Sequence, residues 1–177
     1  MSAPREVGLD EVLAARDARA ARQRALLRRR ELPLVSLTLV SPGPRKAGLR
    51  ARRVMLAALA ALEHVLSEEV WPAVERETLW LPTGPEALFA VNAQPEALKR
   101  RLARLEDEHP LGRLWDLDVL AGAGALSRGE LGLPPRRCLL CGEAAHACSR
   151  SRRHPLPELL RAIEEKVDAF QRNPQLA

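Results

Sequence analysis

Two aspartates in the segment 115–119 are the side chains of this sequence best placed to do chemistry. Residues two apart on a strand point to the same face, so Asp116 and Asp118 would project together, away from the apolar residues between them. Adjacent carboxylates repel each other unless a cation lies between them, which predicts a catalytic Mg²⁺ site able to face a triphosphate. The alternative is a half-exposed edge strand with two solvated aspartates, although aspartate is disfavoured in strands.

Three cysteines and a histidine follow with the spacing of metal ligands, Cys138-x2-Cys141-x6-Cys148-x5-His154. A Cys-x2-Cys pair is the usual half of a zinc site, and three cysteines with one histidine are an accepted ligand set. His146 is a spare candidate. The alternative is a group of buried or redox-active thiols. Because the spacing matches no common zinc finger, a structural Zn²⁺ ion stands beside the thiol alternative as a hypothesis.

Basic residues gather in two places that suit phosphate binding. Arg136 and Arg137 precede the first cysteine, and three arginines follow the third. A turn of chain-breaking residues at 41–44 ends in two cations before an expected helix start, where anions bind well. Arginine suits bidentate phosphate contacts, although a solvated loop is the alternative for such runs. The candidate phosphate-binding residues are Arg45, Lys46, Arg136, Arg137, Arg150, Arg152 and Arg153.

Charge is unevenly distributed along the 177 residues, whose net charge is +5. Residues 1–53 carry +8 (13 basic, 5 acidic), 54–120 carry −6 (6 and 12), 121–155 carry +4 (6 and 2) and 156–177 carry −1 (3 and 4). Basic segments around an acidic middle suit a polyanionic ligand held near a carboxylate-bound metal. Nucleic acid is not favoured, because a chain with no Tyr, two Phe and three Trp has few side chains on which bases could stack.

Composition is that of a soluble globular protein, with 46% hydrophobic and 29% charged residues. No apolar run approaches the ~20 residues that a membrane span needs. Residues 1–11 mix charged and small side chains and lack the apolar core of a signal peptide. We therefore expect a cytoplasmic protein with no membrane partner.

Hydrophobic periodicity predicts alternating helices and strands around these residues. In the first helix, Arg19 and Arg22 share one face and Arg16 lies one turn before them. Breaker-rich loops are expected at 82–85 and 122–124. The expected elements are helices over 8–30, 46–69, 95–108 and 156–172, strands over 34–40, 75–81, 87–91 and 113–120, and an irregular segment over 128–155.

The order of these elements predicts a single α+β domain over 1–177. Its core, 33–120, runs β-α-β-β-α-β, which is typical of a split β-α-β, ferredoxin-like or nucleotidyltransferase-like sheet with helices on one face. To this core are added an N-terminal helix (8–30), a Cys/Arg-rich loop (121–155) and a C-terminal helix (156–172).

Four stretches of the chain together resemble a known family. They are ARDARAARQ (15–23), PLVSLTLVSPGPRK (33–46), HPLGRLWDLDVL (109–120) and LPPRRCLLC…AHACSRSRRH (133–154). In combination, and in this order, they resemble the holo-acyl carrier protein synthase of citrate lyase, also called apo-citrate lyase phosphoribosyl-dephospho-CoA transferase. The resemblance runs over most of the chain.

The resemblance implies a specific reaction. Such enzymes move the phosphoribosyl-dephospho-CoA part of 2′-(5″-triphosphoribosyl)-3′-dephospho-CoA to a serine of the acyl carrier protein subunit of citrate lyase, releasing diphosphate. The resemblance assigns no catalytic residues, so the roles given to the aspartates and arginines come from their chemistry. The alternatives are a non-catalytic protein that docks the carrier subunit or an RNA, and a nucleotidyltransferase that acts on RNA ends.

Overall fold

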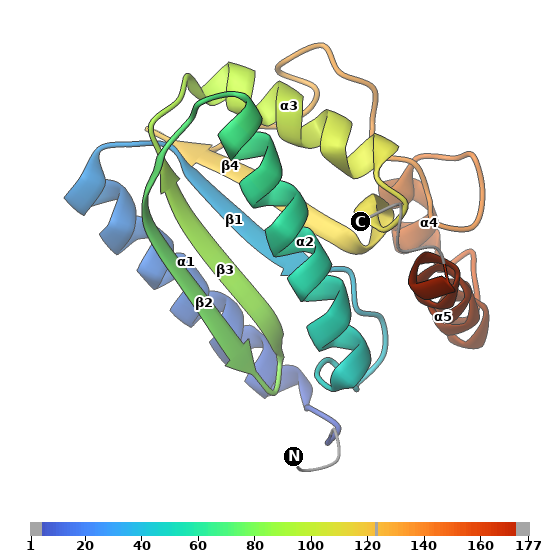
Figure 1. Ribbon diagram of the computed structural model, residues 1–177. Coiled ribbons are helices and arrows are strands. Elements are labelled where there is room, and N and C mark those ends of the chain that lie inside the picture. Colours follow the sequence, from blue (N-terminus) through green and yellow to red (C-terminus); the bar gives the residue numbers. More distant parts are fainter. Residues whose placement is uncertain (1–4, 123, 173–177) are drawn as a thin grey trace.

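The computed structural model describes residues 5–122 and 124–172. Helices and strands alternate as the hydrophobic pattern predicts, with two short elements, β5 and α4, in addition (Figure 1). The helices are α1 (Leu9–Arg30), α2 (Leu49–Glu68), α3 (Pro95–Glu108), α4 (Ala145–Ser151) and α5 (Leu156–Arg172). The strands are β1 (Leu34–Leu39), β2 (Ala73–Leu81), β3 (Gly84–Val91), β4 (Trp115–Ala121) and β5 (Gly124–Ala125), and a 3-10 turn, η1 (Gly112–Leu114), precedes β4.

The strands form one sheet in the order β2-β3-β1-β4-β5. β3 pairs antiparallel with both β1 and β2, so β1 and β2 run parallel to each other with β3 between them. β4 pairs antiparallel with the other side of β1, and the short β5 pairs with β4. Helix α2 links β1 to β2, and α3 links β3 to β4. Helices with an antiparallel sheet confirm the expected α+β class.

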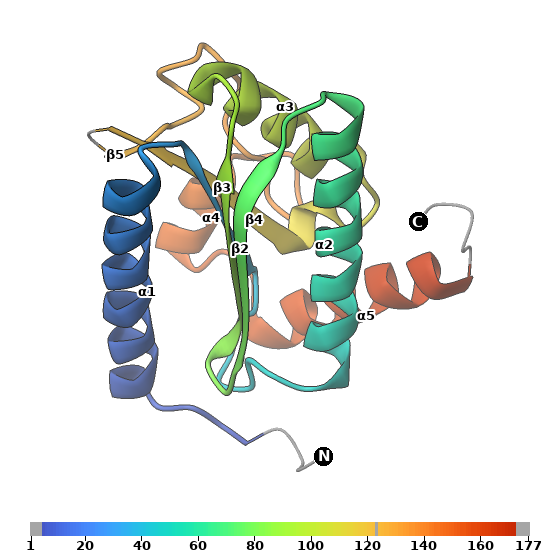
Figure 2. The same cartoon turned by 60° about the vertical axis from the view of Figure 1, so that its left-hand side comes forward.

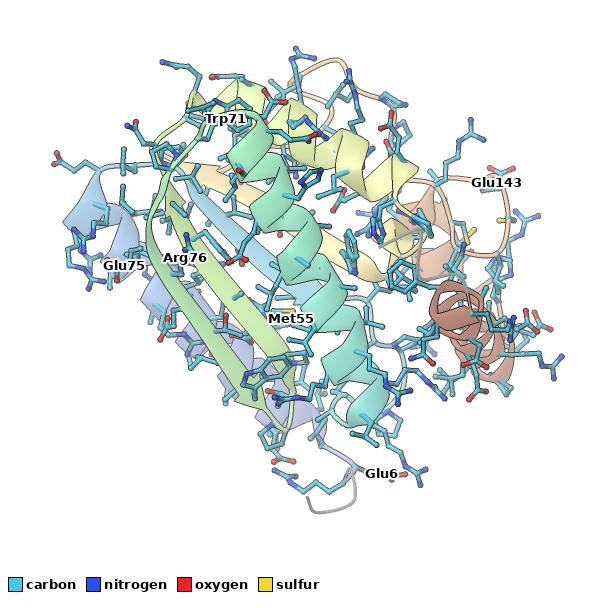
Figure 3. All side chains as sticks on the ribbon, viewed as in Figure 1. Glu6, Met55, Trp71, Glu75, Arg76 and Glu143 are labelled. Atoms are coloured by element: carbon cyan, nitrogen blue, oxygen red, sulfur yellow. The ribbon has the colours of Figure 1, made fainter. Side chains whose placement is uncertain are left out.

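The sheet face toward α2 and α3 carries the main hydrophobic core. Alternate residues of the central strands point into it, among them Val35, Phe89 and Leu117, each at most 1% exposed. Helix α2 presents an apolar stripe that includes Met55 and Leu62, both fully buried, and Figure 3 labels Met55 where α2 crosses the strands. Burying a large apolar side chain contributes ~1.5–3 kcal/mol, so this stripe holds α2 on the sheet.

Helix α1 lies on the opposite face of the same sheet, and Figure 2 shows α1 and α2 on either side of the strands. Its apolar contact is small, because Leu26 of α1 packs with Leu34, Leu88 and Ala90 of the strands. Toward the start of α1 this face carries hydroxyl and carboxylate side chains instead. The fold therefore has three layers, and the two faces of the sheet differ in chemistry.

Two expected boundaries shift for reasons of backbone geometry. Gly48 has a φ of 124°, outside the helical region, so the helix expected from residue 46 begins at Leu49. The loop expected at 82–85 is shorter, because Gly84 and Pro85 belong to β3. Pro85 pairs with β2 at a level that β1 does not reach, so its missing N–H costs no bond to β1.

The segment 128–155 is less irregular than expected. Arg137 and Ala144 form an isolated antiparallel bridge, and α4 follows it directly. Ala123, inside the expected turn at 122–124, lies outside the described residues. Helix α5 begins and ends where the sequence predicts. In the described part of the chain no helix combines the length and the apolar character that crossing a membrane requires.

Candidate active site

Asp116 and Asp118 lie on one face of β4, as the strand period predicts. Trp115, Leu117 and Val119 are at most 1% exposed, whereas the side chains of Asp116 and Asp118 are 48% and 53% exposed. The buried residues point into the core below α2 and α3. The two carboxylates therefore point to the side of the sheet that α1 covers.

Neighbouring strands extend this polar row across the sheet. Thr38 of β1 lies opposite Asp116, and Glu86 of β3 lies opposite Thr38 on the other side. Between this row and α1 is a cavity of about 240 Å³. Its charged and hydroxyl-bearing lining residues are Arg16, Arg19, Thr38, Ser41, Lys46, Thr83, Glu86 and Asp116.

Helix α1 contributes cations to the cavity wall. Arg19 and Arg22 each donate to the buried carboxylate of Glu86, at 2.9 and 2.5 Å. Lys46, in the loop after β1, donates to the carbonyl oxygen of Ser41. Burial and the neighbouring guanidinium of Arg16 lower the pKa of Lys46, as expected where cations crowd a partly buried space. The cavity therefore has positive charge close to the Asp116 carboxylate.

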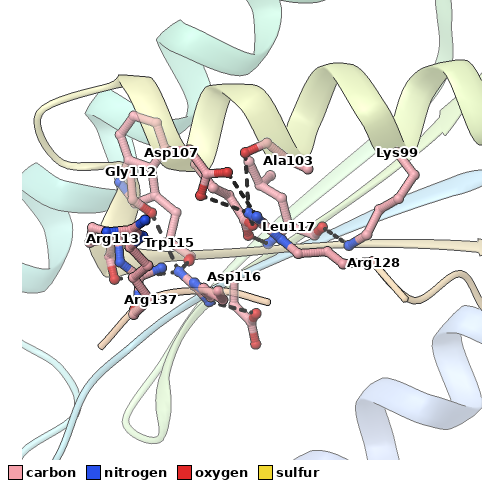
Figure 4. Close-up of polar contacts among 12 residues, drawn as sticks. Lys99, Ala103, Asp107, Gly112, Arg113, Trp115, Asp116, Leu117, Arg128 and Arg137 are labelled. Atoms are coloured by element: carbon pink, nitrogen blue, oxygen red, sulfur yellow. Dashed lines mark hydrogen bonds and ion pairs between the residues drawn. The ribbon is translucent and has the colours of Figure 1, made fainter. Parts of the chain in front are cut away.

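Arg136 approaches Asp116 from the other side. Its Nη1 donates to Asp116 Oδ1 at 3.0 Å, its Nη2 donates to the carbonyl oxygen of Trp115, and Figure 4 shows Asp116 pointing away from α3. A second cavity, of about 560 Å³, opens beyond Arg136. Nitrogens of Arg113 and Arg136, which line it, are buried with no hydrogen-bond partner among the described residues. The arginine pair thus has unused donors at this cavity.

The surroundings of Asp118 favour its protonated form. Burial and the adjacent Asp116 carboxylate raise the pKa of Asp118, and Lys99 Nζ, 3.9 Å from Asp118 Oδ1, acts in the opposite direction. A raised pKa shows that the proton is favoured where two negative charges meet. A divalent cation between the carboxylates would supply the same compensation.

Side chains of α3 fix the position of β4. The edge residue Leu117 accepts a hydrogen bond from Lys99 at 2.9 Å and donates one to Glu106 at 2.8 Å, and Arg128 donates to Glu106 at 2.7 Å (Figure 4). Both α3 side chains are almost fully buried, so they cover the edge of the strand. The chain returns from α3 through Gly112, where a Cβ would lie 2.4 Å from the carbonyl oxygen of Glu106. Only glycine allows this close approach.

The cysteines and His154 form a compact cluster beside the second cavity. One ligand atom from each of Cys138, Cys141, Cys148 and His154 lies within 4.8 Å of all the others, and all three thiols are free. Burial opposes ionisation of Cys138, but hydrogen bonds from the backbone N–H groups of Leu140 and Cys141 lower its pKa to about 6. Burial and the neighbouring thiols raise the pKa of Cys148 to about 12. The cluster could hold a metal ion.

The seven predicted phosphate-binding residues do not form a single group. Arg136 and Lys46 reach the carboxylate site, and Arg152 lines the second cavity. Arg45 lines a third cavity, of about 310 Å³, at the start of α2 and pairs with Glu6 at 3.4 Å. The remaining three line none of these cavities and are exposed: Arg137, Arg150 and Arg153.

Sequence reasoning missed part of this site. Glu86 lies at the edge of an apolar run, where a single carboxylate is a weak signal. The sequence places Arg19 and Arg22 on one helix face, but their partner Glu86 follows only from the order of the strands. Gln23, which donates to Ser36 Oγ at 2.8 Å, belongs to the same polar contact between α1 and the sheet.

Comparison with known proteins places these residues in a family. A family model described as apo-citrate lyase phosphoribosyl-dephospho-CoA transferase matches residues 7–170. Proteins of that name from Escherichia coli O1:K1 / APEC and from Shigella boydii serotype 18 are each 43% identical to the chain over 159 residues, covering 89% of it and 87% of the relative. The matched range includes all four stretches that carry the resemblance seen in the sequence. The chain belongs to the apo-citrate lyase phosphoribosyl-dephospho-CoA transferase family.

Proposed function

We propose that the chain transfers the phosphoribosyl-dephospho-CoA group from 2′-(5″-triphosphoribosyl)-3′-dephospho-CoA to a serine of the acyl carrier protein subunit of citrate lyase. The serine oxygen forms a bond to the α-phosphorus, the bond from that phosphorus to the leaving diphosphate breaks, and the hydroxyl proton is released. The names of the relatives support this reaction. The observation that carries it is the Asp116–Asp118 pair on one strand face, with Asp116 lining a cavity walled by cations.

Mg²⁺ is the metal proposed for the two aspartates. Two carboxylates on one strand face are a donor set that suits this ion. A cation between them would also remove the repulsion that helps to raise the pKa of Asp118. Bound there, the ion would neutralise charge on the triphosphate as the diphosphate leaves. Asp116 keeps an arginine partner as well, so the pair is not left without positive charge before the donor arrives.

The remaining chemistry falls to side chains of this chain. Arg136, Lys46 and Arg19 are close enough to the cavity to neutralise phosphate oxygens, which is the largest demand of phosphoryl transfer. One of the two aspartates orients the incoming hydroxyl. Arg45 and Arg152, at the two neighbouring cavities, would bind more distant parts of the donor, with Arg137, Arg150 and Arg153 in outer positions.

The finer description of the fold belongs to the same proposal. The order β2-β3-β1-β4, with β3 between two parallel strands, supports a split β-α-β sheet of the ferredoxin-like or nucleotidyltransferase-like kind. We treat 1–177 as one transferase domain. The Cys/His cluster takes a structural role in it, because direct in-line transfer needs no thiol nucleophile. A cytoplasmic location stays an expectation from the sequence.

A transfer assay tests the reaction. The chain is incubated with the triphosphoribosyl donor, Mg²⁺ and the apo-carrier subunit, and the carrier is weighed by mass spectrometry while diphosphate is measured. We expect a mass gain of one phosphoribosyl-dephospho-CoA group and one diphosphate per group attached. A carrier with its acceptor serine replaced by alanine is the control. Binding of the carrier with no mass gain would overturn the proposal in favour of a docking protein, which the relatives' names do not favour.

A further inference from the structure

We propose that Cys138, Cys141, Cys148 and His154 bind one Zn²⁺ ion, and that this ion holds Arg136 against Asp116. Binding of the ion does not depend on the proposed function, and only its value for catalysis rests on that function. Arg136 and three of the four ligands, Cys138, Cys148 and His154, line the second cavity together.

Two distances between ligand atoms of the cluster suit tetrahedral zinc, and all four ligand atoms lie within 4.8 Å of one another. Cys141 Sγ lies 3.5 Å from Cys148 Sγ and 3.4 Å from His154 Nε2. Zn–S bonds of about 2.3 Å and Zn–N bonds of about 2.0 Å in a tetrahedron separate the ligand atoms by roughly 3.5–3.8 Å. Three thiolates and one imidazole in a tetrahedral arrangement are a ligand set that favours Zn²⁺ over ions such as Mg²⁺ and Ca²⁺, which bind oxygen ligands.

Backbone hydrogen bonds close the loop around the first two cysteines. The Cys138 N–H donates to the carbonyl oxygen of Glu143 at 2.7 Å, across the loop that carries the Cys-x2-Cys pair. The bridge between Arg137 and Ala144 closes the same loop one residue further out. The loop therefore holds the first two ligands near each other, as a preformed half-site.

The surrounding segment buries few apolar side chains, although Leu126 and Leu139 pack against the main core and Arg128 bonds to Glu106. Between Val119 and Ile163, Cys148 is the one buried residue among those that the structure describes. With so few buried apolar side chains to offset its ordering entropy, a stretch of this length gains most from a cross-link. Because the thiols form no disulfide, a metal ion is the cross-link that the side chains can make.

The cluster connects directly to the carboxylate site. The carbonyl oxygen of Arg136 accepts from the Ala145 N–H at 2.8 Å, at the start of the helix that carries Cys148. The Arg136 side chain reaches Asp116 at 3.0 Å, and Arg113 donates to the carbonyl oxygen of Arg137. Fixing the cysteines therefore fixes the backbone from which Arg136 extends.

Metal analysis of the purified full chain tests the binding. We expect elemental mass spectrometry to find one zinc ion per chain. When Co²⁺ replaces zinc, we expect the visible absorption bands of tetrahedral Co²⁺. The Cys141→Ser variant should lose stoichiometric zinc, and His146→Ala, whose exposed ring lies outside the cluster, should keep it. A wild-type chain that is folded yet binds neither Zn²⁺ nor Co²⁺ would overturn the site, even if the variant fails to fold.

The link to Arg136 has its own measurement, which needs no enzyme activity. Coupling between two sites is reciprocal. If bound zinc strengthens the Arg136–Asp116 contact by some factor, loss of that contact must weaken zinc binding by the same factor. We expect Arg136→Ala to raise the zinc Kd about fivefold or more in competition with a chelator. Arg161→Ala, an exposed arginine of α5, should leave the Kd unchanged. Equal Kd values for wild type and Arg136→Ala would overturn the coupling.

Discussion

The two faces of the sheet are built from the same strands but do different things. Toward α2 and α3, side chains such as Leu37 and Leu117 are fully buried among apolar neighbours. Toward α1, the adjacent residues Thr38 and Asp116 line a polar cavity. Because side chains alternate along a strand, each residue packed in the core has a neighbour that faces the polar cavity. The packed apolar face therefore keeps the side chains of the polar face in fixed positions. This comparison predicts that substitutions on the two faces separate stability from activity.

Breaking the apolar face should have the largest effect. Phe89→Ala removes a side chain that is 1% exposed in the main core, and we expect a loss of about 3–5 kcal/mol in the free energy of unfolding. Chemical denaturation measures it. The folded fraction should keep the transfer rate per molecule, because Phe89 points away from the cavity. A large loss of rate in molecules that are still folded would contradict the division between the faces.

Substitution of the central carboxylate on the polar face should reverse this pattern. Asp116→Asn keeps the shape of the side chain and removes its charge, and we expect transfer to fall ~10²-fold or more, the scale of losing a key charge stabiliser. The denaturation midpoint should stay close to that of the wild type, because the side chain is half exposed. The matched control is Asp168→Asn, an exposed carboxylate on α5. Normal turnover by Asp116→Asn would remove this residue from the mechanism.

The sequence was enough for the parts of the site that are local. Asp116 and Asp118 share a face because the strand period is two, and this needs no knowledge of the fold. The role of Arg19 could not be found this way, because its partner Glu86 is 67 residues away and meets it only when β3 lies beside β1. Sequence separation, not residue type, set the limit.

The Cys/Arg-rich loop shows a second limit. Arg152 and Arg153 are adjacent and chemically equal, so the sequence treats them alike. In the structure Arg152 adopts the left-handed conformation at the end of α4, with a φ of 48°, and it lines the second cavity while Arg153 does not. The two side chains therefore differ in where the backbone at the end of α4 directs them, and residue type alone does not predict that backbone conformation.

A smaller effect is expected where α1 meets the polar face. Arg22→Ala removes one of two arginines that hold the buried Glu86 carboxylate, and losing a hydrogen bond to a charged group costs roughly 1.5–3 kcal/mol of stability. Arg24→Ala, an exposed neighbour on α1, is the control and should change stability little. In a Glu86→Gln background the same Arg22→Ala change should cost less stability in thermal unfolding, because the carboxylate charge is already gone. If Arg22→Ala costs as much in that background as in the wild type, the charge of Glu86 is not what the arginine compensates.

The smallest expected effect is also the one whose sign depends on pH and metal. Burial and Asp116 raise the pKa of Asp118 above its value in the unfolded chain, so the protonated form is favoured by folding. The stability from this group is fully present below the unfolded pKa and is lost as pH rises through the folded pKa. Asp118→Asn mimics the neutral acid, so in buffer without Mg²⁺ it should unfold at a slightly higher temperature than the wild type at neutral pH. That difference should shrink as pH falls through the raised pKa.

Mg²⁺ should invert the order of the two proteins at neutral pH. The wild type binds the ion through both carboxylates and gains stability by mass action, whereas Asp118→Asn has lost one ligand and gains less. Thermal unfolding across a Mg²⁺ titration measures the crossing. If Asp118→Asn is the less stable protein even without Mg²⁺, the contact with Lys99 outweighs the repulsion from Asp116. In that case Lys99 of α3 stabilises the charged form of Asp118, and repulsion between the two aspartates does not favour a cation at the polar face.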